Sequence, residues 1–246
     1  MLDGISFIGI DEKTDLDKLN LVAEISDGPE IEFGVLYSES KMSQGHKRYP
    51  SKKWVENFTD VFWKGKIPSY STSLHLCGSA IEKYLDKDQY LVDLVNQFDR
   101  VQLNFSMDKF KPDELTEKLF ALEKVVDSVT VLQFNKSKAA FVESFTKQVK
   151  LPSRLLYNIL FDGSGGFGRV LEAPQKPIDG FYCGYAGGIG PETVLDIITK
   201  IDKVVGNEYY YIDMESKIRE DDYLSIDKCI EVVKIVNQYL EDQDSL

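Results

Sequence analysis

Cysteine is scarce in this sequence. The 246 residues contain three cysteines, Cys77, Cys183 and Cys229, and no Cys-x-x-Cys pair. An odd number of widely separated thiols excludes a disulfide framework and offers no zinc-site spacing. Such usage is typical of a reducing compartment, so we expect a cytoplasmic protein that carries no metal and no cofactor.

Positive charge and long apolar runs are also lacking. Acidic residues outnumber basic ones by 41 to 29, which leaves a net charge of -12 and a pI near 4.7. A surface of that sign repels phosphate backbones and anionic lipid. No apolar run approaches the roughly 20 residues of a membrane span, and Asp3 stands where a signal peptide carries positive charge. We therefore expect no nucleic-acid or membrane partner, but a small-molecule ligand bound by a monomer or homodimer.

What the chain does contain is a series of short apolar runs, most of them followed by a segment with helical spacing. This alternation predicts a parallel sheet covered by helices. Eight such units in a chain of this length close most simply as a single-domain (β/α)8 TIM barrel over residues 1–246, which is an α/β fold. The expected strands are Ile5–Ile10, Ile31–Tyr37, Tyr70–Leu76, Val101–Phe105, Val129–Phe134, Leu155–Phe161, Phe181–Tyr185 and Tyr209–Ile212.

Two helical segments of this pattern stand out. Apolar residues recur at steps of three and four between Leu224 and Leu240, which predicts a long final helix with Cys229 on its buried face. Between the sixth and seventh strands, the glycine-rich segment 162–169 is followed by Pro174 and Pro177. These residues leave little room for a full helix, so we expect a shortened one there.

The stretch 181–194 combines a strand, a glycine turn and a helix start. Pro191 follows Gly187, Gly188 and Gly190, and proline is favoured at the first position of a helix. Backbone N–H groups in such a turn can bind a phosphate. In a (β/α)8 barrel the loop after the seventh strand is a common phosphate site, so we expect Gly187 and Gly188 to bind one.

Two acids directly follow apolar strands. Asp11 comes after the first strand and Asp162 ends the sixth. Carboxylates at the mouth of a barrel could act as a base and an acid on one substrate. The alternative is that both aspartates cap the loops that follow them, because aspartate is a frequent turn residue.

Amides end the fourth and fifth strands. Gln102 shares a strand face with Asn104, and Gln133 with Asn135, so the pairs either contact a ligand or form an internal polar layer. His75 is expected to pack inside the barrel.

Several segments resemble phosphoribosylanthranilate isomerase, the barrel enzyme of tryptophan biosynthesis, and more distantly its relative in histidine biosynthesis. The resemblance follows the strand order over most of the chain. Ala186–Val194 looks like the family's Ser-Gly-Gly-Leu-x-Pro-Glu-Asn-Val phosphate turn. Other matching segments are Lys47–Ser51, Val101–Asn104, Leu160–Asp162, Gly165–Arg169 and Ile212–Ser216.

This resemblance implies an Amadori rearrangement, an aldose–ketose isomerisation of an aminated ribose 5-phosphate. Asp162 would be the acid that opens the sugar ring, and Asp11 the base that takes a proton from C2. Arg48 would meet the anthranilate carboxylate. The remaining implied ligands of the substrate are Gln102, Asn104, Gly165 and Gly166, and those of the phosphate are Gly187, Gly188, Ser216 and Lys217.

Departures from the family pattern keep other readings open. Asp11 stands where the tryptophan enzyme has cysteine, Asn104 where it has histidine, and Lys217 where it has a phosphate-binding glycine, next to the additional acid Glu215. One alternative is a divergent barrel without catalysis that binds a phosphorylated ligand or a partner protein. Another is a different phosphosugar isomerase or aldolase, for which Lys136 beyond the fifth strand would be the candidate Schiff-base lysine.

Overall fold

The computed structural model describes residues 1–64, 69–163 and 173–244. Eight parallel strands pair in chain order and close into one barrel, so the predicted (β/α)8 fold and the single domain are confirmed. The closing pair is β1 with β8, and a residue shift interrupts its register between Leu2 and Gly4. The strands are β1 Leu2–Ile8, β2 Glu30–Tyr37, β3 Ser71–Cys77, β4 Arg100–Asn104, β5 Val129–Phe134, β6 Tyr157–Asp162, β7 Tyr182–Ala186 and β8 Tyr210–Met214.

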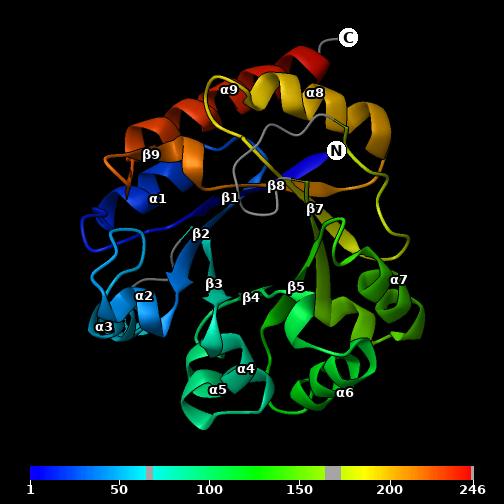
Figure 1. Ribbon diagram of the computed structural model, residues 1–246. Helices are drawn as coiled ribbons and strands as arrows, with labels where there is room; N and C mark the ends of the chain where they lie inside the picture. The colour runs from blue at the N-terminus through cyan, green and yellow to red at the C-terminus, as the bar shows by residue number, and fades with distance from the viewer. Residues whose placement is uncertain (65–68, 164–172, 245–246) are drawn as a thin grey trace.

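Helices form an outer ring around these strands (Figure 1). Their apolar faces pack against the barrel, as on α8, where Val194, Ile197, Ile198, Ile201 and Val205 are buried. The helices are α1 Asp17–Glu24, α2 Glu39–Ser43, α3 Lys52–Lys64, α4 Ser79–Leu85, α5 Gln89–Val95, α6 Pro112–Leu122, α7 Ala139–Gln148, α8 Val194–Val205 and α9 Ile226–Asp244. Short 3-10 turns cover Met107–Lys109, Ser153–Leu156 and Ser216–Ile218.

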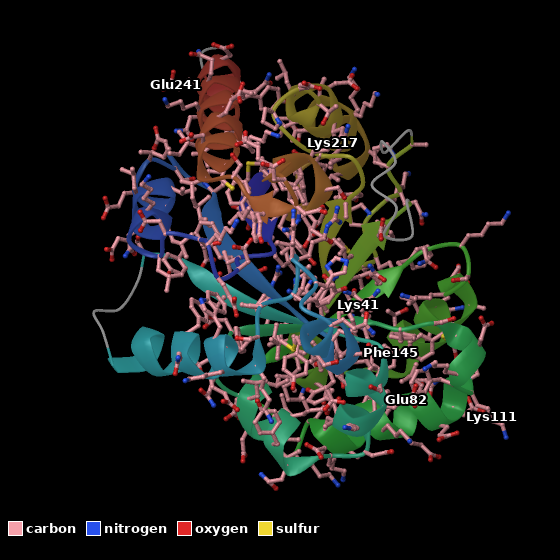
Figure 2. The ribbon with its side chains drawn as sticks, turned by 60° about the vertical axis from the view of Figure 1, so that its left-hand side comes forward. Lys41, Glu82, Lys111, Phe145, Lys217 and Glu241 are labelled. Atoms are coloured by element: carbon pink, nitrogen blue, oxygen red, sulfur yellow. The ribbon has the colours of Figure 1, made fainter. Side chains whose placement is uncertain are left out.

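The final helix α9 matches the predicted stripe. Cys229, Val232, Val233 and Val236 on its inner face are all fully buried. Burial raises the pKa of the Cys229 thiol, so this cysteine is a structural side chain in the core. Charged side chains lie at the periphery, as Figure 2 shows for Glu82, Lys111 and Glu241.

Two local predictions are corrected. Helix α8 begins at Val194, not at Pro191, because Gly190–Thr193 forms a separate turn in which Gly190 O accepts from both Thr193 N and Val194 N. Between β8 and α9 the chain forms a small antiparallel hairpin, β9 Arg219–Glu220 with β10 Tyr223–Leu224. Leu224 therefore belongs to this hairpin, and the final helix begins at Ile226 rather than at Leu224. The shortened helix expected between β6 and β7 falls largely on residues outside the described ranges; the described part, 173–181, contains none.

The barrel interior contains a buried ion pair. Arg100 on β4 donates to both carboxylate oxygens of Glu32 on β2, at 2.6 and 2.8 Å. It also donates to Ser6 Oγ at 3.1 Å, and its guanidinium stacks 4.2 Å from the ring centre of Tyr211. His75 lies nearby, and burial lowers its pKa to about 4, so it is a neutral interior residue as expected.

No helix in the described ranges is both long enough and apolar enough to cross a bilayer.

Candidate functional site

A cavity of about 680 Å³ opens at the carboxyl ends of the strands. This is the end at which (β/α)8 enzymes place their active sites. The loops that follow β4, β5, β7 and β8 form its walls. Its floor contains one side chain from each of six consecutive strands: His75, Gln102, Gln133, Asp162, Ala186 and Asp213.

Two carboxylates face this cavity from the same layer of the barrel. Asp162 on β6 pairs in register with Ala186 on β7, and Ala186 pairs with Asp213 on β8. The two aspartates therefore flank the small side chain of Ala186, and both are almost fully buried. Asp162 Oδ2 accepts a hydrogen bond from Gln133 Nε2 at 3.2 Å.

Asp213 has an environment unlike that of Asp162. Its Oδ2 has no hydrogen-bond partner among the described residues. Burial raises the pKa of Asp213 well above its usual value, and the charges of Glu32, Asp162 and Glu215 act in the same direction against the opposing effect of Arg100. The raised pKa favours the protonated form of Asp213, which is the form that a general acid needs.

A buried lysine lies on the same side of the cavity. Lys138 precedes α7, is 3% exposed, and donates from Nζ to Gln133 Oε1 at 2.7 Å. Its ammonium lies 4.6 Å from the ring centre of Phe105. Burial lowers the pKa of Lys138 to about 8, although the charge of Asp162 opposes this shift.

The glycine turn after β7 lines the cavity. Gly187 and Gly188 adopt φ angles of 130° and 64°, which L side chains rarely tolerate. Thr193 braces this turn: its Oγ1 donates to Gly188 O at 2.7 Å and accepts from Gly190 N at 3.1 Å. In the described part of the chain, the N–H groups of Gly188 and Ile189 have no protein acceptor, so they remain able to bind an anion.

The loop after β8 contacts this turn directly. A Cβ atom at Gly190 would lie 2.4 Å from the Cβ of Lys217, so only glycine lets the two loops approach this closely. Ser216 and Lys217 both line the cavity, and Figure 2 shows Lys217 on the side of α8. The backbone of the glycine turn and the exposed residue Lys217 thus lie side by side at one end of the cavity.

The amides of β4 join the opposite wall. Gln102 Nε2 donates to Asn104 Oδ1 at 2.9 Å, and Asn104 Nδ2 contacts Cys77 Sγ at 3.4 Å. Both amides line the cavity, with Cys77 and Tyr49 beside them. They can therefore contact a ligand, although their mutual hydrogen bond also satisfies part of their polar surface.

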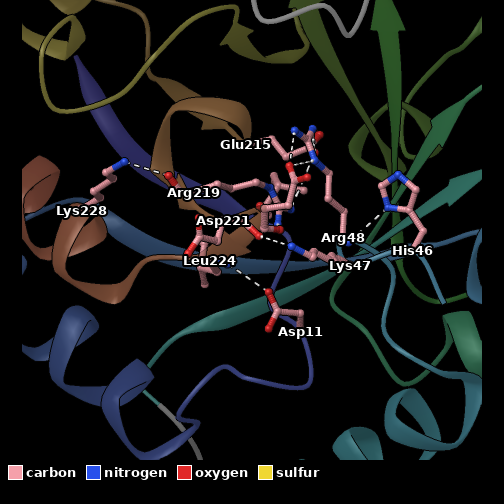
Figure 3. A network of polar contacts seen from close by, with 11 residues as sticks. Asp11, His46, Lys47, Arg48, Glu215, Arg219, Asp221, Leu224 and Lys228 are labelled. Carbon is pink, nitrogen blue, oxygen red and sulfur yellow. Dashed lines mark hydrogen bonds and ion pairs between the residues drawn. The ribbon is translucent and has the colours of Figure 1, made fainter.

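Asp11 does not meet Asp162 across the mouth. Strand β1 ends at Ile8, and Asp11 lies three residues further along the loop, outside the cavity lining formed by the described residues. Its Oδ1 accepts from Lys13 N at 2.9 Å. Its Oδ2 accepts from Leu224 N at 3.0 Å (Figure 3). These contacts match the alternative in which aspartate caps its loop, because they join that loop to the hairpin before α9.

Arg48 is also held away from the cavity. Its guanidinium donates to Asp222 Oδ1 at 2.9 Å and to Glu215 Oε1 at 3.2 Å (Figure 3). The additional acid Glu215 is thus an ion-pair partner of Arg48, and Arg48 does not line the cavity among the described residues. Gly165 and Gly166 lie outside the described ranges.

Sequence reasoning missed two residues of this site. Asp213 lies in Ile212–Ser216, a segment already noted as similar to the isomerase family, and its place directly after an apolar strand was the signal that could have identified it. Lys138 carries no comparable signal, since its burial depends on Phe105 from another unit. Within the described ranges, no group of three His, Cys, Asp or Glu side chains is arranged to hold a metal ion.

No protein family and no curated protein matches this chain. Its fold is similar to that of several solved structures. A phosphoribosylanthranilate isomerase from Thermotoga maritima superposes with a TM-score of 0.55 and 18% identity over 96% of this chain and 98% of that one. Tryptophan synthase subunit alpha from Legionella pneumophila superposes with a TM-score of 0.54 and 10% sequence identity, over 96% of this chain and 93% of that one. Fructose-bisphosphate aldolase from Campylobacter jejuni superposes with a TM-score of 0.51 and 11% sequence identity, over 98% of this chain and 89% of that one. At these identities the likeness shows a shared fold, and the chain is a TIM-barrel protein.

Proposed function

We propose that this chain is an aldose–ketose isomerase that acts on a phosphorylated sugar. An aminated ribose 5-phosphate is the substrate that the sequence resemblance favours. One observation carries the proposal: two inequivalent carboxylates, Asp162 and Asp213, face the same cavity as the glycine turn Gly187–Gly188 and Lys217.

The two acids suit the two proton transfers of the reaction. Isomerisation removes a proton from C2 and delivers one to the neighbouring carbon or to a departing ring oxygen, so it needs a base and an acid. Asp213, with its raised pKa, is the proposed acid, and Asp162, oriented by the amide of Gln133, is the proposed base. This assignment moves the partner of Asp162 from Asp11 on the first loop to Asp213 on β8. It also changes the role of Asp162 from the acid, which the resemblance implies, to the base.

The phosphate would occupy the end of the cavity beside β7 and β8. The N–H groups of Gly188 and Ile189 and the ammonium of Lys217 supply donors and positive charge there. Lys217 would thereby take over the role of the glycine that the isomerase family has at this position. Because Gly190 admits Lys217 at van der Waals contact, both sets of donors can reach one phosphate group.

Turnover of phosphoribosylanthranilate by the purified protein tests this proposal. Asp162→Asn and Asp213→Asn should each lower kcat by about 10²- to 10⁴-fold, the usual contribution of a general acid or base. Asp196→Asn on α8, whose side chain is 65% exposed, is the matched control and should leave kcat unchanged. Asp11→Asn should also retain turnover, which separates the two candidate partners of Asp162. Absence of turnover in the parent protein would remove this substrate, and full activity in both cavity variants would remove the mechanism.

One observation favours the alternative, a barrel that binds a phosphorylated ligand or a partner protein without turning it over. Arg48, which the resemblance assigns to the anthranilate carboxylate, is engaged by Glu215 and Asp222 instead. Rescue of a tryptophan auxotroph distinguishes the two functions, because binding without catalysis cannot restore growth.

A further inference from the structure

Lys138 has no part in the acid and base roles assigned above, yet its amine faces the same cavity. The side chain is 3% exposed and lines the cavity together with Asp162 and Asn135. It lies in the turn Asn135–Lys138 between β5 and α7, where Lys138 N donates to Asn135 O. The backbone of this turn thus aims a long side chain back over the end of the barrel.

The contacts of the Lys138 amine orient it without neutralising it. Nζ donates to Gln133 Oε1, and Gln133 Nε2 donates in turn to Asp162 Oδ2, so one glutamine side chain connects the amine to the carboxylate. The other face of the ammonium lies against the ring of Phe105. Among the described residues no carboxylate lies within ion-pair distance of Lys138, which is unusual for a buried lysine.

This environment favours the neutral amine. With its pKa lowered to about 8 by burial, about a tenth of the Lys138 side chains are neutral at pH 7, against fewer than about one in a thousand for an ordinary lysine. A neutral amine in an apolar pocket is the nucleophile that condenses with carbonyl groups. Lys136, two residues earlier, lines the same cavity but lies on its exposed rim.

We propose that Lys138 forms an imine with the carbonyl carbon of a phosphorylated aldose or ketose whose phosphate is bound at Gly187–Gly188. This inference rests on the proposed function in one respect, the site of the phosphate. It extends the substrate class to sugar phosphates with a free carbonyl group, which need no amine of their own.

The atoms of the step balance without another reactant. The nitrogen lone pair of Lys138 attacks the carbonyl carbon, a C–N bond forms, and the carbonyl oxygen takes up two protons and leaves as water. One proton comes from the attacking nitrogen and the other from the protonated form of Asp213, so the products are a protonated imine, water and the Asp213 carboxylate. Water reverses the condensation. While it lasts, the imine acidifies the neighbouring C–H group, which carries the proton that isomerisation moves to Asp162.

Reductive trapping tests the inference on the intact protein. The protein is incubated with ribose 5-phosphate or dihydroxyacetone phosphate and sodium cyanoborohydride, and digested for mass spectrometry. We expect one adduct, of the mass of the sugar phosphate less one oxygen, on the peptide that contains Lys138. The labelling rate should rise with pH to a midpoint near pH 8, because burial lowers the pKa of Lys138 to about 8 against the opposing charge of Asp162. Inorganic phosphate should compete with the label.

The variants separate this adduct from random glycation. Lys138→Met should lower the label at least tenfold, whereas Lys136→Met, a matched change two residues away, should retain it. Label on Lys136, or spread evenly over surface lysines, would overturn the inference. So would the absence of label in the parent protein if calorimetry shows that ribose 5-phosphate still binds, and in that case the proposed function stands. Absence of both label and binding would overturn the Lys138 imine and the proposed isomerase function together. Label on Lys138 without an isomerised product would support the imine and overturn the isomerase function.

Discussion

Replacing Asp213 by asparagine should stabilise the folded protein while it removes catalysis. The Asp213 carboxylate is nearly buried, and its Oδ2 has no hydrogen-bond partner among the described residues. The charges of Glu32, Asp162 and Glu215 disfavour its ionised form further. Asparagine keeps the shape of the side chain and carries no charge, so the folded state should no longer bear this cost.

The size of the effect follows from the buried charge, because asparagine removes the charge but keeps a polar atom at the position of Oδ2. Relief of one buried, poorly paired charge lies within the usual range of single substitutions, about 0.5–3 kcal/mol. We therefore expect the free energy of unfolding of Asp213→Asn to exceed that of the parent by about 1–2 kcal/mol at pH 7. For a chain of this length that gain corresponds to a rise in Tm of about 2–8 °C.

The sign of the pH dependence is a second check. The pKa of Asp213 in the folded state is raised, so the protonated carboxyl favours the folded protein. This contribution of Asp213 to stability is fully present below the unfolded-state pKa of about 3.9 and is lost as the pH rises through the folded-state pKa. The advantage of the variant should therefore be near zero below about pH 3.9 and grow to a plateau at higher pH.

Denaturant unfolding followed by circular dichroism between acidic and neutral pH measures this difference. Asp196→Asn on the exposed face of α8 is the control and should change stability by less than about 0.5 kcal/mol at any pH. A variant less stable than the parent at pH 7, or a gain that does not depend on pH, would refute the reasoning.

Two further predictions concern the barrel interior and the phosphate turn. Glu32→Gln should lower the free energy of unfolding by about 3–5 kcal/mol at pH 7, because it leaves Arg100 buried without its partner. Burial acts to raise the pKa of Glu32, but the charge and hydrogen bonds of Arg100 outweigh burial, so the net pKa is lowered. The difference in free energy of unfolding between parent and variant should therefore narrow as the pH falls below the usual glutamate range. A difference that stays constant with pH in denaturant unfolding would contradict this. Gly188→Ala should weaken ribose 5-phosphate binding at least about tenfold by calorimetry, since φ is 64° and a side chain there costs about 1–2 kcal/mol. Gly206→Ala, with φ 66° at the end of α8 and open space around it, imposes the same strain away from the cavity, and equal loss of binding in both variants would show that strain alone is responsible.

The contacts around Arg48 and Asp11 have a common structural effect. Arg48 joins the loop after β2 to Glu215 and Asp222, and Asp11 joins the loop after β1 to Leu224 (Figure 3). Both therefore anchor the segment that connects β8 with α9. That segment begins with Glu215, Ser216 and Lys217, which line the cavity. Arg48 and Asp11, which are not among the described lining residues, therefore help to position the proposed phosphate end of the cavity.

Much of the fold could be predicted from the sequence because it depends on local patterns. Most strands contain a short apolar run that is buried on both faces, and α8 and α9 have apolar residues at helical spacing. This alternation alone indicates a (β/α)8 barrel. The same holds for site residues that end a strand or form a turn: Asp162, Gln102 and Gly187–Gly188 line the cavity because their place in the chain puts them at the carboxyl ends of parallel strands.

Only the tertiary structure decided which acids share the cavity and which lysine is buried. Asp11 and Asp213 both follow apolar residues, but the pairing of Gly4–Ile8 with Glu30–Gly34 ends β1 before Asp11, whereas the register of β7 with β8 puts Asp213 level with Asp162. Strand register and the closure of the barrel are set by pairing between distant segments, which no local pattern encodes. Lys138 depends on Phe105 and Gln133 in the same way, because burial and the pKa shift it causes arise from neighbours that only the folded chain brings together.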